Sequence, residues 1–253
     1  MTANEYIQSI LRKYEVQRGP SSPAEILGNI VADPIIKWAG KYLKKLFYSG
    51  SYAKHTGVKG NTDVDIFISL SSDTPGSLKD IYNNLVQLAN ENKWSTRQQN
   101  TSVGIEINGT KADLVPGRVQ QSNQNYHSLY FKKSDSWTQT NVDMHISTVL
   151  ESGRIDEIRV VKIWRFLHNL DFPSIYLELF VLDSLSGYSK ADTASNVLCV
   201  LKNIGEKLST ARIVDPANTN NIISETLTSA EKIVIQRQAS KSGNEPYWER
   251  IIW

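Results

Sequence analysis

Residues 47–70 read FYSGSYAKHTGVKGNTDVDIFISL, and this stretch decides the fold that the sequence predicts. It places a Gly50-Ser51 pair ahead of a strand that opens with Asp63 and Asp65. Side chains alternate across a β-strand, so the two carboxylates share one face while the apolar residues between and after them face a core. Neighbouring carboxylates repel, and divalent cations relieve that repulsion and can bridge them to a triphosphate. The stretch therefore predicts phosphoryl or nucleotidyl transfer with Mg²⁺ and nucleoside triphosphates (NTPs).

A third carboxylate, Asp113, lies in the segment KADLVPGR, on a strand that follows the hairpin signal Asn108-Gly109. Neighbouring antiparallel strands lie about 5 Å apart, close enough for one metal to be shared across them. We expect Asp63 and Asp65 to hold two Mg²⁺ ions, for which Mn²⁺ can substitute. Asp113 would ligate the ion that activates an attacking hydroxyl. The alternative is that Asp113 is an ordinary surface residue of its strand.

The Gly50-Ser51 pair predicts a phosphate-binding turn. Glycine lets the backbone come close to phosphates, and N–H groups at the start of a short helix over residues 51–55 attract anions. The Ser51 hydroxyl can donate to the same phosphates. A Gly-Ser pair alone is usually only a turn, so its weight comes from its place before Asp63 and Asp65.

Composition sets the class of protein. The chain has 253 residues, 40% of them hydrophobic and 21% charged, which is ordinary for one large or two small globular domains. Its 28 basic and 26 acidic residues give no general case for coating nucleic acid. The single cysteine excludes an intrachain disulfide. No apolar run is long enough to span a bilayer and the N-terminus does not read as a secretory signal, so we expect no membrane partner and a cytoplasmic location.

Periodicity predicts an α+β organisation with a change of character near residue 140. The front half, residues 1–140, is mixed, and the back half, residues 141–253, is all-helical. In the front half we expect helices over 2–14, 22–46 and 77–90, and strands over 47–50, 64–70, 94–99, 103–108 and 111–115. In the back half we expect helices over 142–152, 155–170, 174–185, 194–208 and 222–239. We expect residues 240–245 to be flexible and the terminal YWERIIW to pack onto the body.

These segments resemble a known superfamily. GSYAKHTGVKGNTDVDIFI is similar to the Gly-Ser, spacer and Asp-x-Asp motif of DNA polymerase β-type nucleotidyltransferases, and ADLVP resembles their third-carboxylate strand. VVKIWRFL, PSIYLELFVLDSL and VDPANTNN resemble segments of oligoadenylate synthetases and of cGAS/DncV-like nucleotidyltransferases (CD-NTases). Class I CCA-adding enzymes share much of this pattern. The resemblance covers about residues 40–225. It implies a palm domain with an N-terminal spine helix over 1–140 and an oligoadenylate synthetase-like helical domain over 141–253.

The resemblance also implies roles in the helical half. Lys162 and Ser174 would contact the triphosphate, and a lysine suits both its oxygens and the charge on departing pyrophosphate. Tyr176 is our choice for an aromatic that stacks on the nucleobase. Glu178 would brace the helical half. The alternative for Lys162 is a solvated helix residue.

Four lysines, Lys37, Lys41, Lys44 and Lys45, are predicted to form a stripe on the helix over 22–46. The resemblance places this helix against double-stranded nucleic acid in oligoadenylate synthetases and cGAS. A solvated cationic face is the favoured interpretation, because the net charge is only +2. A double-stranded nucleic-acid activator is thus the weaker alternative.

The leading functional hypothesis is a template-independent nucleotidyltransferase. A ribose hydroxyl attacks the α-phosphate of an NTP, and the product is a cyclic or linear oligonucleotide second messenger in bacterial antiphage defence. Addition to an RNA or tRNA 3′ end ranks second, because the chain has little room for separate RNA-holding domains. An inactive nucleotide- or RNA-binding module ranks last, because such a pseudoenzyme would be expected to lack one of Asp63, Asp65 and Asp113.

Overall fold

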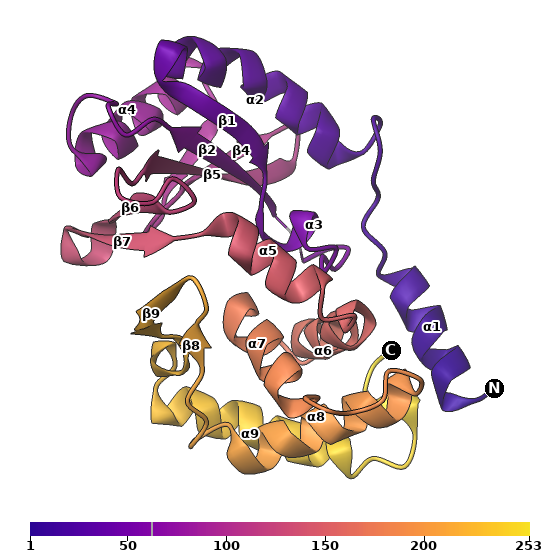
Figure 1. The fold of residues 1–253 in the computed structure, drawn as a ribbon. Helices are drawn as coiled ribbons and strands as arrows, with labels where there is room; N and C mark the ends of the chain where they lie inside the picture. Colours follow the sequence, from indigo (N-terminus) through magenta and orange to yellow (C-terminus); the bar gives the residue numbers. More distant parts are fainter. Residues whose placement is uncertain (62) are drawn as a thin grey trace. The chain divides into compact units, whose positions relative to one another are not determined.

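The computed structural model describes residues 1–61 and 63–253, whose helices and strands are drawn in Figure 1. The described residues separate into two compact units, and neither is one continuous stretch of chain. The sheet unit holds residues 17–54 and 63–146, and the helical unit holds residues 1–16, 55–61 and 147–253. The change of character predicted near residue 140 therefore falls close to one crossing between the units. The first helix and the short segment 55–61 group with the C-terminal helices.

The sheet unit is built on a sheet whose main strand order is β1-β2-β5-β4-β3, with β6 paired to β5 and β7 to β6. Its strands are β1 (Leu43–Tyr48), β2 (Val64–Leu70), β3 (Ser95–Gln98), β4 (Val103–Ile107), β5 (Thr110–Val119), β6 (His127–Phe131) and β7 (Ser136–Thr140). Its helices are α2 (Pro23–Ala39), α3 (Gly50–Ala53) and α4 (Leu78–Glu91), with 3₁₀ turns over Gly40–Tyr42 and Lys132–Ser134. Figure 1 shows α2 and α4 along the same face of the sheet, where their apolar sides are buried.

Helix α2 starts as the sequence predicts and ends earlier. The Ser22 side chain caps it and Pro23 is its first residue. The predicted helix to residue 46 is wrong, because Gly40 takes φ +52° and ends α2 at Ala39. The lysine stripe is corrected with it: the four lysines are spread over a helix, a turn and a strand, namely Lys37 on α2, Lys41 in the 3₁₀ turn, and Lys44 and Lys45 on β1.

Strands β2 and β5 are parallel neighbours, with Asp65 in register with Asp113. The sequence predicts antiparallel neighbours here, which is wrong. The predicted hairpin does form, with Ile107 opposite Thr110, and it pairs β5 antiparallel to β4. The chain between β2 and β5 includes α4, β3 and β4. A connection of that length allows the parallel pairing that a short turn forbids.

The helical unit packs around one apolar core. Its elements are α1 (Ala3–Lys13), α6 (Ile155–Leu167), α7 (Ser174–Ser184), α8 (Thr193–Lys207), α9 (Ser229–Gly243), the hairpin strands β8 (Val214–Asp215) and β9 (Asn218–Ile222), and 3₁₀ turns over Ile223–Thr226 and Trp248–Arg250. Helix α5 (Val142–Leu150) contributes to both units. Trp164 is fully buried in this core, and α1 contributes Ile7 to the same cluster.

The C-terminal part of the helical unit differs from prediction in two places. The β8–β9 hairpin was not predicted, and the helix predicted over 222–239 is α9, which starts at Ser229 and continues through residues predicted to be flexible. The chain end packs as predicted, since Ile251 and Ile252 are buried in the core. Across residues 1–61 and 63–253, the helices lack the combination of length and apolar character that crossing a membrane requires.

Candidate active site

The Gly-Ser turn lies directly against the carboxylate of Asp65. The Ser49 backbone N–H donates to the Asp65 carbonyl at 2.8 Å, and the Ser51 backbone N–H bonds the Asp65 side chain. Gly50 has φ +55°, and a Cβ atom there would lie 1.8 Å from Asp65 Oδ2. Only glycine meets both demands. The short helix predicted after the turn is α3, which starts at Gly50.

Three carboxylates share the end of the sheet that follows this turn. Register partners on parallel strands point to the same face, so Asp65 and Asp113 lie side by side, and Asp63 precedes Asp65 by two residues. Burial raises the pKa of Asp65 to about 6, with a further rise from the charge of Asp113 and a smaller one from Asp63. Burial also raises the pKa of Asp113, again with help from Asp63. The three carboxylates therefore repel one another at a site that is partly shielded from water.

The donor set fits a hard divalent cation. Mg²⁺ prefers carboxylate oxygens, and a cation would remove the repulsion that adds to the effect of burial on the pKa values of Asp65 and Asp113. Within the described residues, no group of three or more Asp, Glu, His or Cys side chains is arranged so that it could hold a metal ion. Instead Asp113 Oδ1 accepts a 2.6 Å hydrogen bond from Gln99, and Asp63 Oδ2 lies 4.0 Å from Arg97. Metal binding by the three aspartates stays a prediction.

Several residues of this site were missed from the sequence. The Lys54 side chain is 6% exposed and its charge lowers the pKa of Asp65, against the larger effect of burial. Gly104, opposite Asp113 on β4, leaves space for the Gln99–Asp113 contact: a Cβ atom there would lie 2.9 Å from Gln99 Nε2. A signal existed for Lys54 alone, because it lies one helical turn after Gly50.

Lys162 lies in a buried polar cluster within the helical unit. Its ammonium donates to Glu178 on α7 and, at 2.9 Å, to the hydroxyl of Thr56. Thr56 in turn donates to Glu178 Oε1 at 3.0 Å. Lys162 is 2% exposed, so the alternative of a solvated helix residue is wrong. Glu178 has the bracing contacts predicted for it. Triphosphate binding by Lys162 stays a prediction, and it would require the ammonium to give up bonds that it makes here.

The other two residues predicted in the helical half also have partners there. Ser174 is the first residue of α7, and its hydroxyl accepts a hydrogen bond from Arg165 at 3.0 Å. Tyr176 is fully buried, packs edge-on against Phe172 and donates to the Leu208 carbonyl. The structure therefore presents no exposed ring face for the base stacking predicted at Tyr176.

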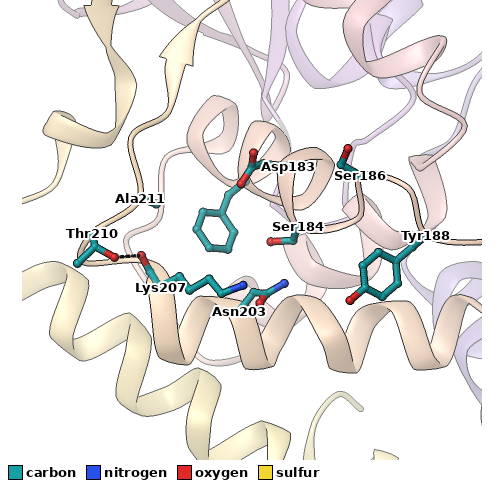
Figure 2. Close-up of a pocket in the computed structure, with 9 residues that line it drawn as sticks. Asp183, Ser184, Ser186, Tyr188, Asn203, Lys207, Thr210 and Ala211 are labelled. Carbon is teal, nitrogen blue, oxygen red and sulfur yellow. Dashed lines mark hydrogen bonds between the residues drawn. The ribbon is translucent and has the colours of Figure 1, made fainter.

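A pocket of about 420 Å³ opens elsewhere in the helical unit, between the end of α7 and α8. Figure 2 shows Asp183 and Ser184 at the end of α7, Tyr188 in the following loop, and Asn203 and Lys207 on α8. The hydroxyl of Ser184 is buried and has no hydrogen-bond partner within the described residues. None of the predicted site residues lines this pocket.

Comparison with known proteins gives a match in structure alone. No protein-family model and no curated protein sequence matches the chain. The CD-NTase CdnG of Bradyrhizobium diazoefficiens, solved in complex with GTP, matches with a TM-score of 0.80 at 9% identity, over 96% of this chain and 91% of that one. E. coli CdnC, solved in complex with HORMA-deltaN, matches with a TM-score of 0.77 at 18% identity, over 98% and 96%. The CdnE cyclic dinucleotide synthase of Elizabethkingia meningoseptica, solved with GTP and Apcpp, matches with a TM-score of 0.70 at 14% identity, over 94% and 98%. The chain therefore has the α+β fold of the CD-NTase nucleotidyltransferases, as the resemblance predicted.

Proposed function

We propose that this protein is a metal-dependent, template-independent nucleotidyltransferase. A ribose hydroxyl attacks the α-phosphate of an NTP, and pyrophosphate leaves. The observation that carries the proposal is the in-register pairing of Asp65 and Asp113 on parallel strands, next to a turn that excludes any side chain at Gly50. A glycine without room for a Cβ atom beside repelling carboxylates is an arrangement suited to phosphates and cations.

In the sheet unit, the aspartates and the Gly50-Ser51 turn have different proposed roles. Asp63, Asp65 and Asp113 would hold two Mg²⁺ ions, which supply Lewis-acid stabilisation of the phosphates and a more acidic ribose hydroxyl. The backbone around Gly50 and the Ser51 hydroxyl would bind triphosphate oxygens. From the helical unit, we keep Lys162 and Ser174 as predicted triphosphate contacts.

The fold neighbours support a small oligonucleotide as the product. CdnE of E. meningoseptica is a cyclic dinucleotide synthase, and CdnC and CdnG were solved with ATP and GTP respectively. On this basis we propose a cyclic or linear oligonucleotide second messenger, made in the cytoplasm for bacterial antiphage defence. CdnC was also solved with a HORMA protein. A protein regulator is therefore a further candidate partner for this chain, beside the double-stranded nucleic acid considered from the sequence.

The test is an incubation with all four α-labelled NTPs and Mg²⁺ or Mn²⁺, followed by phosphatase. The wild type should yield a small phosphatase-resistant product, and the Asp63→Ala/Asp65→Ala double variant should yield none. Parallel reactions contain double-stranded DNA, double-stranded RNA, or tRNA. Label that enters only the tRNA would favour RNA-end addition. Absence of turnover in every reaction, with NTP binding retained, would favour a binding module.

A further inference from the structure

The segment 55–61 joins two parts of the candidate site in sequence, yet it belongs to the helical unit. It follows Lys54 directly and ends two residues before Asp63. Val58 lies in the core cluster of the helical unit and is 2% exposed. The Lys59 backbone N–H donates to the Tyr14 carbonyl at 2.9 Å. The chain between the phosphate-binding turn and the aspartate strand is therefore anchored among the helices.

Thr56 is a buried polar anchor of this segment. Its hydroxyl accepts a hydrogen bond from Lys162 and donates one to Glu178, so both roles of the hydroxyl are used. All three side chains are at most 2% exposed. A buried ion pair is stable only when further hydrogen bonds satisfy its remaining donors and acceptors. The Thr56 hydroxyl is one such group, and it binds to both charges.

This contact also fixes the register of the segment. The neighbours of Thr56 are His55 and Gly57, and neither has a hydroxyl. A shift of the segment by one residue would leave the ion pair without its shared hydroxyl, in a place that excludes water. Apolar packing of Val58 alone is non-directional and would not define the position as sharply. The hydrogen bonds therefore supply the specificity of the anchor.

We infer that Lys162 and Glu178 are positioning residues, which hold the segment 55–61 through Thr56 and so place Asp63 for metal binding. The inference rests on the proposed function, and it gives Lys162 a role that does not need contact with the triphosphate. The segment follows Lys54 directly and ends two residues before Asp63, so its anchor limits the movement of the chain on both sides of it. A displaced segment would therefore disturb the site from both sides.

The test uses Thr56→Val, which keeps the shape of the side chain and removes the hydroxyl. Amide hydrogen exchange reports on the anchor at two backbone groups, the Lys59 N–H bonded to Tyr14 and the Asn61 N–H bonded to Val58. Both should exchange faster in the variant. The affinity for Mn²⁺, measured by paramagnetic resonance of the unbound ion, should fall about tenfold, as for other groups that orient metal ligands. The turnover rate kcat should fall by a similar factor, with KM for the NTP little changed.

Two further variants separate positioning from general stability. Thr56→Ser keeps the hydroxyl and should restore Mn²⁺ affinity and amide protection. Glu157→Gln breaks a second buried ion pair of the same unit, in which Arg154 Nη1 lies 3.0 Å from Glu157. It should lower stability and leave Mn²⁺ affinity unchanged. If the valine variant does not fold, Lys162→Arg, which keeps the charge and changes the geometry, is measured in the same way.

The inference is overturned if Thr56→Val binds Mn²⁺ and protects both amides as the wild type does. It is also overturned if the variant raises KM for the NTP and leaves Mn²⁺ affinity and kcat unchanged, because the segment would then act on the substrate. A wild type without NTP turnover whose Mn²⁺ affinity still depends on Thr56 would support the anchor and remove the proposed function. The two failures are thus distinguishable.

Discussion

The sheet unit and the helical unit differ in how their charged side chains are arranged. In the sheet unit, Asp63, Asp65 and Asp113 place like charges close together, and burial, with this repulsion added to it, raises the pKa values of Asp65 and Asp113. In the helical unit, Lys162 and Glu178 are opposite charges joined through a shared hydroxyl. Uncompensated repulsion is relieved when a cation binds, whereas a compensated pair is complete without any ligand. The cluster of aspartates is therefore typical of a cation-binding site, and the Lys162–Glu178 pair is typical of a structural contact.

The largest expected effect is on catalysis in the sheet unit. Asp65→Ala should lower NTP turnover by about 10³-fold or more, because metal ligation is expected to contribute several kcal/mol to the transition state. Asp73→Ala removes an exposed aspartate from the loop after β2 and is the matched control. Turnover is measured from release of labelled pyrophosphate. Equal turnover rates for Asp65→Ala and Asp73→Ala would contradict the interpretation of the aspartate cluster as the catalytic site.

The next effect is on stability in the helical unit. Glu178→Gln keeps the size of the side chain and leaves the buried Lys162 charge uncompensated, which should cost about 3 kcal/mol of unfolding free energy. The double variant Lys162→Met/Glu178→Leu removes both charges and should be more stable than Glu178→Gln. Urea unfolding curves check both. A Glu178→Gln variant as stable as the wild type would show that the pair is not an architectural element.

Two glycines with positive φ test the importance of close packing at the predicted phosphate-binding turn. Gly50 and Gly40 have nearly equal φ angles, +55° and +52°, but a Cβ atom at Gly40 would meet nothing within 4 Å. Gly50→Ala and Gly40→Ala therefore both place a side chain at a positive φ, and only the first collides with Asp65. Gly50→Ala should lower kcat by about 100-fold through displacement of the site, and Gly40→Ala should keep most of the activity. Similar kcat values would argue against close packing at Gly50.

A smaller effect follows from the raised pKa of Asp65. Its folded-state pKa of about 6 lies above the ordinary value of 3.8, so the folded protein binds this proton more tightly than the unfolded chain does. That contribution to stability is complete below pH 3.8 and is lost as the pH rises through 6. Without metal, Asp65→Asn should therefore be more stable than the wild type at pH 7, by about 3 kcal/mol, and no more stable below about pH 4.

Thermal unfolding across pH measures this difference, and added Mg²⁺ tests its origin. The ion should stabilise the wild type at pH 7 and leave Asp65→Asn nearly unchanged, since binding to the folded state alone raises stability. An Asp65→Asn variant that is less stable than the wild type at pH 7 without metal would show that the carboxylate is compensated already.

The smallest effect is expected at the lysines. Lys44 and Lys45 are exposed on β1, the edge strand of the main sheet order, where lysines discourage pairing with other chains. Lys44→Glu/Lys45→Glu should leave NTP turnover within about twofold, with or without added double-stranded RNA, because exposed charges contribute little. A large loss of activity that depends on RNA would revive the nucleic-acid interpretation.

The features predicted correctly from the sequence are those that depend on residues close together in the chain. Gly50 and Asp65 lie on the turn and strand expected for them, Asp63 comes one residue before that strand, and the Asn108-Gly109 hairpin formed as predicted, because turn residues and alternation act over a few positions. The parallel partner of β2 was missed, since pairing across a long crossover leaves no local pattern. The early end of α2 had a visible signal in Gly40, which the lysine periodicity outweighed.

The burial of Lys162 was the least accessible feature from the sequence. A lysine is almost never fully buried unless it is paired, and its partners, Thr56 and Glu178, are separated from it by 106 and 16 positions. Nothing in one sequence without structure links residues so far apart. The burial of Tyr176, predicted to stack on a nucleobase, had no clear signal either: helix α7 is apolar on several sides, so its pattern does not separate inner from outer faces.

The chain passes between its two units after residues 16, 54, 61 and 146. Neither unit can therefore be expressed as a simple truncation, and no single recombination point would transfer one unit intact to another protein.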